Sequence, residues 1–228
     1  MLSHWGYPRQ DDGPAVAAMV RAQWRSIWKR VGSTYAEAYR DRPGASSVAQ
    51  RRAGWIASLP VFSDAASVCE AGCGCGRNLA ELARRRHVRV EGLDICPEAI
   101  GECRRILPSG LFTEADLLEL APESTPRADV VLACGVLTHI PPDRVRGVLD
   151  TLWSLAERAL VIVDELGHGV LKGPRRWRPL VKATGEYVAW AHDLWTPLNE
   201  MRTHAVSLEA VPEHLRTIGA QWLYVVRK

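Results

Sequence analysis

The sequence predicts an α/β fold with a doubly wound, mostly parallel sheet. From Val68 onward, short apolar runs typical of buried strands alternate with helical patterns at intervals of about 20 to 30 residues, as expected for strands joined by crossover helices. The 228 residues are enough for one such domain with a substantial core and a small additional segment. We therefore expect an N-terminal helical segment over residues 1–60 and a core domain over residues 61–228.

Composition and charge narrow the class of protein. Hydrophobic residues make up 47% of the chain and charged residues 24%, as is ordinary for a soluble globular protein. The net charge of +3 is too small to indicate nucleic acid binding. No apolar run approaches the roughly 18 residues that span a bilayer, and the N-terminus lacks a signal pattern. We expect a cytoplasmic protein that binds neither nucleic acid nor membrane, with its oligomeric state open.

Helical patterns fill the N-terminal segment. From Ala15 the apolar residues follow helical spacing, and Gly32 is expected to end that helix. Thr34 and Glu37 match a capping box and predict a second, short helix. A third helical stretch is predicted over residues 47–59.

A glycine-rich turn follows the first predicted strand. The run from Ser67 to Leu79 reads SVCEAGCGCGRNL and places glycines at alternate positions 72, 74 and 76. Glycine is needed where a ligand touches the backbone and where φ is positive. The spacing differs from the G-x-G-x-x-G pattern that holds a pyrophosphate, and Glu70 just before the turn would repel one. The turn therefore fits a ligand other than a dinucleotide.

Acidic residues follow the next two predicted strands. Residues 88–93 form a strand-like run that ends on Asp94, where a carboxylate is suited to bind the two hydroxyls of a ribose. Pro97 begins a helical pattern, and residues 111–117 predict a third strand with Asp116 near its end. The glycine turn and Asp94 together indicate a nucleoside cofactor.

A fourth predicted strand completes the expected site. Residues 130–133 form a buried run that ends beside Cys134. The carboxyl ends of parallel strands meet at one edge of a sheet, so Gly72, Asp94, Asp116 and Cys134 are expected to line one crevice.

The remaining elements are predicted as follows. A helix over residues 143–156 leads to a fifth strand over 159–166, and the loop over 167–185 has no assigned structure. We expect a short helix that begins at Trp190 and ends near Pro197 or beyond, and two final strands over 203–211 and 221–227.

These motifs resemble those of the class I S-adenosylmethionine (SAM) dependent methyltransferases of the small-molecule type. Their first motif is an acid followed by G-x-G-x-G, as in Glu70 to Gly76, and the run GVLTHIPP from Gly135 looks like their fourth-motif region. With the Gly-Arg-Asn-Leu after the turn, the chain is most similar to bacterial methylases associated with sugar and pseudaminic acid biosynthesis, from roughly Tyr35 to the C-terminus.

The resemblance implies SAM as the cofactor and a Rossmann-like, seven-stranded, mostly parallel sheet with an antiparallel last strand. Because the SAM sulfonium is cationic, Glu70 is tolerable near it. An acid at Asp116 would reach the adenine amine, or it could simply begin a turn. The aromatic residues of the N-terminal helices fit either a core or a helical lid that closes over the methionine end. The implied cofactor-binding residues are Tyr35, Arg40, Glu70, Gly72, Gly74, Gly76, Asp94, Ile95, Asp116, Leu117 and Cys134.

Methyl transfer needs a base only when the acceptor carries a proton at working pH. The candidates are His139, Glu165, His168 and His192, each just past a strand or in a segment on the substrate side. His139 could instead tie a turn to the backbone, Glu165 could bond its loop, and the other two are single histidines. No metal is expected, because Cys69, Cys73 and Cys75 do not match zinc spacings, although a redox or metal role stays open for them.

The sequence thus predicts an enzyme that moves a methyl group from SAM to oxygen or nitrogen of a small molecule in a natural-product or sugar pathway. An NAD(P)-dependent oxidoreductase and a non-catalytic SAM-binding module are the alternatives. A basic cluster could bind an anionic substrate or form a solvated loop, and it comprises Lys172, Arg175, Arg176 and Arg178.

Overall fold

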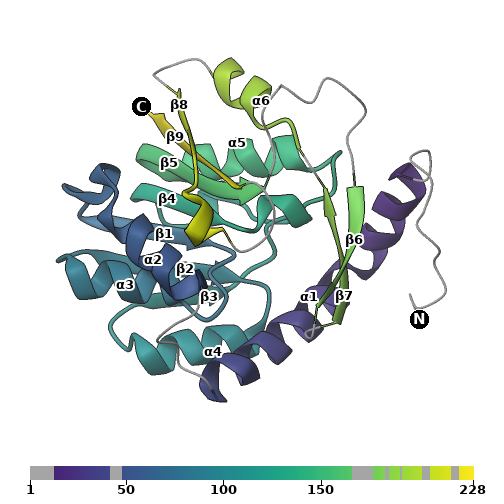
Figure 1. The fold of residues 1–228 in the computed structure, drawn as a ribbon, viewed down its shortest axis with the longest axis horizontal. Coiled ribbons are helices and arrows are strands. Elements are labelled where there is room, and N and C mark those ends of the chain that lie inside the picture. The colour runs from purple at the N-terminus through teal and green to yellow at the C-terminus, as the bar shows by residue number, and fades with distance from the viewer. Residues whose placement is uncertain are drawn as a thin grey trace.

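The computed structural model describes residues 13–41, 48–165, 177–182, 185–190, 192–201, 206–216 and 221–228. Within these ranges a seven-stranded sheet runs through the centre of the molecule, with helices on either side of it (Figure 1). Its strand order is β3-β2-β1-β4-β5-β9-β8. The predicted seven-stranded α/β sheet is confirmed.

The strands of this sheet are β1 (Ser67–Ala71), β2 (Arg89–Asp94), β3 (Leu111–Glu114), β4 (Ala128–Cys134), β5 (Ala156–Glu165), β8 (Val206–Ala210) and β9 (Gln221–Arg227). The first five are parallel to one another, whereas β9 is antiparallel to both β5 and β8. The antiparallel last strand is therefore confirmed as well. The helices are α1 (Gly13–Asp41), α2 (Val48–Ser58), α3 (Arg77–Arg85), α4 (Pro97–Ile106), α5 (Val145–Leu155) and α6 (Trp195–Glu200).

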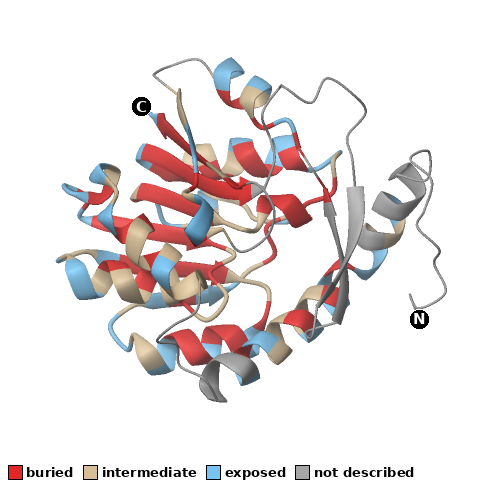
Figure 2. Ribbon diagram, in the orientation of Figure 1, coloured by how far each residue is buried: buried red, intermediate tan, exposed pale blue. Residues whose placement is uncertain are grey.

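Two apolar cores flank the sheet, one on each face. Strand β1 buries all five of its residues, and alternate side chains enter different cores, Val68 on one face and Cys69 on the other. Figure 2 shows the central strands buried along their length. Residues of α2, α3 and α4 fill one core, while α5, α6 and Trp24 of α1 fill the other. A sheet covered on both faces is typical of parallel strands.

The N-terminal segment differs from its prediction, because α1 is one continuous helix through both Gly32 and Thr34. The Thr34 hydroxyl donates to the Arg30 carbonyl at 3.1 Å, as in a helix interior, and does not cap a second helix. Gly32 has a packing role instead. A Cβ atom added there would lie 2.5 Å from Cβ of Cys96, so glycine lets α1 pass close to the start of α4.

The segment after β5 also differs from its prediction. Strands β6 (Trp177–Lys182) and β7 (Gly185–Trp190) form a separate antiparallel two-stranded sheet, where only a loop was expected. This small sheet stands apart from the main one, and β7 contacts α1 (Figure 1). The start of the helix expected from Trp190 is wrong as well, since Trp190 ends β7 and the helix α6 begins only at Trp195 and runs to Glu200.

Candidate cofactor and active site

A cavity of about 330 Å³ lies at the carboxyl edge of the main sheet. The ends of β1, β2, β4 and β5 contribute to its lining, and residues of α1 and α2 contribute from the N-terminal segment. The strand ends therefore meet at one edge as expected, and Gly72, Asp94 and Cys134 all line this cavity.

The glycine turn forms part of this lining. Gly72, Gly74 and Gly76 have φ values of 68°, 52° and 73°, in the left-handed region that glycine adopts without strain. The turn is tied to the next strand, because the Gly72 and Cys73 amides both donate to the Leu93 carbonyl, at 2.7 and 3.0 Å. A Cβ on Gly74 would meet no atom of the described residues within 4 Å, so the backbone at this glycine faces open space that a side chain would enter.

Asp94 lies directly against the turn. Its Oδ2 accepts the Gly74 amide at 2.8 Å, and its Oδ1 accepts the Cys96 amide at 2.9 Å. Burial raises the pKa of this carboxyl, and the backbone hydrogen bonds oppose that rise. Each oxygen keeps a further lone pair for a ligand hydroxyl.

Glu70 supplies a buried acid to the same cavity. It is 1% exposed, and the Asn78 side-chain amide donates to its Oε1 at 2.5 Å. Its Oε2 is buried and has no hydrogen-bond partner among the described residues. Burial raises the pKa of Glu70 to about 8, although Asn78, Arg52 and Arg77 counteract part of that rise. A buried carboxyl oxygen without a partner is costly, and a cationic ligand group in the cavity would relieve that cost.

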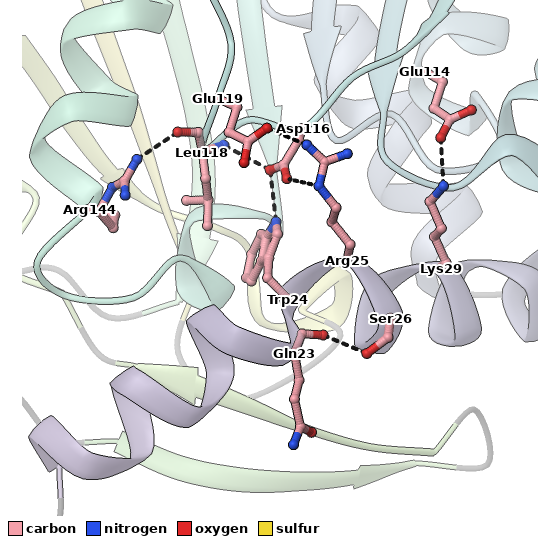
Figure 3. A network of polar contacts seen from close by, with 10 residues as sticks. All are labelled: Gln23, Trp24, Arg25, Ser26, Lys29, Glu114, Asp116, Leu118, Glu119 and Arg144. Carbon is pink, nitrogen blue, oxygen red and sulfur yellow. Dashed lines mark hydrogen bonds and ion pairs between the residues drawn. The ribbon is translucent and has the colours of Figure 1, made fainter.

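Asp116 has a different environment from the one expected (Figure 3). Its Oδ1 accepts the Trp24 indole N–H at 2.9 Å and the Leu118 amide at 3.0 Å, while Arg25 Nε lies 3.3 Å from Oδ2. The carboxylate does not line the cavity, although the next residue, Leu117, does. Contact of Asp116 with adenine stays a prediction, and the contacts in the structure join it to α1.

Helix α1 supplies an aromatic wall to the cavity. Trp24, Trp28 and Tyr35 all line it, and Tyr35 is partly open to solvent. The ring centroids of Trp28 and His139 lie 4.5 Å apart. Trp24 also belongs to a hydrophobic core, and closure of these residues over a cofactor stays a prediction.

The four candidate bases fall in different places. His139 lines the cavity, 9% exposed, at the end of the short 3₁₀ helix η4 (Leu137–His139). His192 does not line the cavity, since it is buried with Nε2 2.9 Å from the Ile140 carbonyl oxygen. Glu165 ends β5, but its side chain lies outside the described part of the chain, as does the whole of His168. His139 is thus the candidate that the described structure places at the site.

Three other residues complete the predicted set. Ile95 lines the cavity beside Asp94. Gly76 precedes α3 and is not among the lining residues, because its Cα faces Cys103, whose sulfur would lie 3.0 Å from an added Cβ. Arg40 belongs to α1, and its side chain is outside the described part of the chain. The basic cluster of Lys172, Arg175, Arg176 and Arg178 is outside it too, apart from the backbone of Arg178.

Several lining residues were missed by the sequence analysis. Asn78 directly follows the glycine turn, so its position could have suggested a role. Asp164 accepts the Thr138 amide at 3.0 Å, and Arg52 donates to Gln221 at 3.1 Å. Arg52 and Gln221 are 169 residues apart and share no sequence pattern that would pair them.

The described residues were also compared with the patterns of metal sites, disulfides and membrane-spanning helices. None of their His, Cys, Asp and Glu side chains gather in a group that could hold a metal ion, and all six cysteines are free. The described helices include none with the length and apolarity to cross a membrane.

Comparison with known proteins agrees with this geometry. Residues 68–158 match the family model of a methyltransferase domain. The chain is 28% identical over 124 residues to a trans-aconitate 2-methyltransferase of Escherichia coli O1:K1 / APEC, covering 54% of this chain and 45% of that protein. It is 29% identical over 172 residues to a trans-aconitate 2-methyltransferase of Azoarcus sp. (strain BH72), covering 68% of this chain and 62% of that protein. The match to the first curated relatives spans about half of their length.

A solved structure shows the same fold. It is the Burkholderia thailandensis 1,6-didemethyltoxoflavin-N1-methyltransferase with bound 1,6-didemethyltoxoflavin and S-adenosylhomocysteine. The TM-score is 0.62 at 21% identity, over 91% of this chain and 89% of that one. This likeness shows the fold, and the methyltransferase-domain match over residues 68–158 is consistent with it. The neighbouring structure holds S-adenosylhomocysteine, and the open space at Gly74, Asp94 and the partnerless oxygen of Glu70 would fit such a molecule.

Proposed function

We propose that this protein transfers a methyl group from SAM to oxygen or nitrogen of a small-molecule acceptor. The observation that carries the proposal is the glycine turn, which faces open space in a cavity that also contains Asp94 and the partnerless oxygen of Glu70. When bound, the cofactor supplies an electrophilic methyl group on a cationic sulfur.

The residues of the chain then have separate tasks. Asp94 binds the ribose hydroxyls through lone pairs that the Gly74 and Cys96 amides leave available. Trp28 and Tyr35 of α1 cover the cavity and exclude water, so residues 1–60 act as a lid on the core domain of 61–228. Holding the acceptor in line with the methyl carbon can contribute roughly 7 to 11 kcal/mol to catalysis at best.

His139 is the proposed base for an acceptor that carries a proton. It lines the cavity, and its ring lies against Trp28. A neutral imidazole at that position can accept a proton from a hydroxyl or an amine as the methyl group is transferred.

The acceptor is proposed to be a small anionic or sugar-like molecule. The curated relatives are named for trans-aconitate, which is a carboxylate. The resemblance to methylases of sugar biosynthesis supports the sugar pathway, and the basic cluster from Lys172 to Arg178 supports an anion.

The proposal is tested first by calorimetry with S-adenosylhomocysteine and with NADH. We expect binding of S-adenosylhomocysteine alone, and binding of NADH alone would instead indicate the oxidoreductase alternative. The protein should then release S-adenosylhomocysteine from SAM when it is offered carboxylate and sugar acceptors in turn. A protein that binds SAM but releases no product with any acceptor would be a binding module.

Asp94→Ala tests the predicted ribose contact. Loss of charge-assisted hydrogen bonds should weaken S-adenosylhomocysteine binding by roughly 2 to 3 kcal/mol in calorimetry. Asp150→Ala is the matched control, because Asp150 pairs with Arg146 on the exposed side of α5. Equal affinity of the Asp94→Ala and wild-type proteins would show that Asp94 is not the ribose ligand.

A further inference from the structure

Two thiols meet behind the glycine turn. Cys73 belongs to the turn, Cys103 belongs to α4, and their sulfur atoms lie 3.9 Å apart. The sequence places Cys73 near Cys69 and Cys75, but in the structure it contacts a thiol 30 positions away. Cys69 faces the opposite core of the sheet. The tasks described above make no use of this pair of thiols.

The pair holds the backbone of the glycine that faces the cavity. Both sulfur atoms lie within hydrogen-bonding distance of the Gly74 carbonyl oxygen, Cys103 at 3.1 Å and Cys73 at 3.6 Å. The amide of Gly74 donates to Oδ2 of Asp94 at 2.8 Å. This residue is therefore fixed by a carboxylate at its amide and by thiols at its carbonyl, so a change at the thiols reaches the turn directly.

The two thiols differ in how they can be reached. Cys73 lines the cavity and is 6% exposed, whereas Cys103 is 0% exposed and is not part of the lining. A small oxidant in the empty cavity therefore meets Cys73 first, with Cys103 in contact behind it. A reachable thiol beside a second thiol that can resolve it is one feature of redox-active cysteines. A ligand that fills the cavity would cover Cys73.

The protonation of the pair makes it slow to react at neutral pH. The hydrogen bond with Cys103 and burial raise the pKa of Cys73 above its ordinary value, and the nearby carboxylates of Asp94 and Glu70 raise it further. The thiolate is the form that attacks an oxidant, so only a small fraction of the protein reacts at any time. The rate of oxidation should rise about ten-fold for each pH unit as that fraction grows.

We propose that Cys73 and Cys103 form a reversible disulfide when a peroxide enters the empty cavity, and that this disulfide weakens binding of the cofactor. The Cys73 sulfur, having lost its proton, attacks one oxygen of hydrogen peroxide; the O–O bond breaks, and a sulfenic acid and one water form. The Cys103 sulfur then attacks the sulfenic sulfur, the S–S bond forms, and the departing hydroxide takes the Cys103 proton as a second water. The thiols lose two electrons and two protons, and peroxide is reduced to two waters. A dithiol reductant reverses the change by thiol–disulfide exchange.

The disulfide changes the backbone that lines the cavity. A disulfide has no S–H donor, so the Gly74 carbonyl loses its hydrogen bonds from both cysteines. The sulfur atoms must also approach from 3.9 Å to about 2 Å, so the turn and α4 must shift toward each other. The amide of Gly74 moves with its carbonyl and away from its place against Asp94. The loss of affinity rests on the proposed cofactor, whereas formation of the disulfide does not.

The first test detects the disulfide itself. The full chain is treated with hydrogen peroxide, remaining thiols are blocked by alkylation, and linked peptides are identified by mass spectrometry. We expect a link between Cys73 and Cys103 that forms about ten-fold faster at pH 8 than at pH 7. S-adenosylhomocysteine at about ten times its dissociation constant should slow its formation about ten-fold, because it leaves few cavities empty.

The second test measures the effect on binding. In calorimetry, the oxidised wild type should bind S-adenosylhomocysteine about 10-fold or more weakly than the reduced wild type, and dithiothreitol should restore the affinity. Cys103→Ser keeps a donor for the Gly74 carbonyl but cannot form the disulfide, so peroxide should not change its affinity. Cys75→Ser is the matched control, because Cys75 also lines the cavity and its loss leaves the pair intact. Its affinity should still fall on oxidation and recover on reduction.

Each outcome supports or overturns one part of the inference. A link from Cys73 to Cys75, or oxidation of single cysteines without any link, overturns the pair. A link between Cys73 and Cys103 without loss of affinity overturns the control of binding. Failure of the reduced wild type to bind S-adenosylhomocysteine overturns the proposed function, while mass spectrometry still decides whether the disulfide forms. Cys103→Ala replaces Cys103→Ser if the midpoint of thermal unfolding shows that the serine variant is not folded.

Discussion

At the scale of single residues, Glu70 carries a buried carboxyl whose ionisation is costly. It is 1% exposed, one oxygen is bonded to Asn78, and burial raises its pKa from 4.5 to about 8. At neutral pH the free protein therefore keeps Glu70 largely protonated. Ionisation becomes favourable when a cation enters the cavity, which couples the charge of this residue to ligand binding.

This pKa shift predicts a pH dependence of stability. The folded protein holds the Glu70 proton up to about pH 8, whereas the unfolded chain releases it near 4.5, so the free energy of unfolding should fall by a few kcal/mol as pH rises between those values. Glu70→Gln should remove most of that fall, as measured by urea unfolding at pH 5, 6.5 and 8. The raised pKa of Asp94 changes stability in the same direction, and this contribution is common to the wild type and the variant.

The same slope in wild type and Glu70→Gln would contradict the prediction. It would mean that Glu70 titrates near its ordinary pKa in the folded protein, despite its burial.

Whether a cavity residue could be predicted depends on whether it lies near a recognisable motif in the sequence. Glu70, Gly74 and Asp94 could be predicted, because a turn that touches a ligand restricts residue types within a few positions of a strand end. Arg52 and Gln221 could not, because their pairing depends on how α2 and β9 pack and not on any local pattern. Asp116 was predicted from its place after β3, but the sequence held no sign of its bond to Trp24.

At the scale of elements, α1 is fixed across the carboxyl edge of the sheet by a row of polar contacts. Arg21 pairs with Asp143 at 2.8 Å, Lys29 pairs with Glu114 at 2.8 Å, and Arg25 pairs with both Asp116 and Glu119. Figure 3 shows the contacts of Arg25 and Lys29 in this row. It also shows the indole of Trp24, another residue of α1, pointing at the Asp116 carboxylate. At least one partner in each ion pair is exposed, so each pair alone contributes little to stability. The hydrogen bond from the Trp24 indole is buried.

Trp24→Phe should therefore destabilise the protein more than the loss of an ion pair does. Phenylalanine keeps most of the apolar contact but removes the donor to a buried carboxylate, and we expect a loss of about 1.5 to 3 kcal/mol in urea unfolding. Arg25→Gln removes the exposed partner of the same carboxylate and should cost less than about 1 kcal/mol. The reverse order of losses would show that the ion pairs, rather than the indole bond, hold α1.

The crossing of α1 and α4 gives a second prediction for this element. In Gly32→Ala the new Cβ would lie 2.5 Å from Cβ and 2.7 Å from the sulfur of Cys96, so the helices must separate, at a cost of about 1 to 3 kcal/mol. The control is Gly101→Ala in α4, where an added Cβ meets nothing within 4 Å. Helix propensity alone should make that variant more stable by about 0.5 to 1 kcal/mol. A gain of stability in both variants would show that α1 tolerates a side chain at this crossing.

At the scale of the whole molecule, the main sheet could be predicted from the sequence, whereas the β6–β7 sheet and the continuous helix α1 could not. Alternation of apolar runs and helical patterns predicted the five parallel strands, and the family resemblance predicted the antiparallel last one. The β6–β7 sheet was missed, because its residues have neither a regular alternation nor a tight turn signal. The continuous α1 was missed because a glycine that serves close packing looks the same in sequence as a glycine that ends a helix.

The cavity joins distant parts of the chain, which predicts an effect of ligand on the whole fold. Its lining takes residues from α1 and α2 at one end of the sequence and Gln221 of β9 at the other. S-adenosylhomocysteine at about 100 times its dissociation constant should therefore raise the free energy of unfolding by about 2.7 kcal/mol in one cooperative transition. Thermal unfolding followed by circular dichroism measures the shift, with NADH as the control ligand. A separate, unshifted transition for part of the molecule would show that the N-terminal segment unfolds independently of the core.

The position of β9 has a consequence for synthesis on the ribosome. This strand lies between β5 and β8, although both of them precede it along the chain. While β9 is still inside the exit tunnel, β5 is an unpaired edge strand of an incomplete sheet, and β8 has no strand to pair with in that sheet. Unpaired edge strands of this kind readily pair with strands of other chains. The nascent polypeptide is therefore prone to aggregate until β9 emerges.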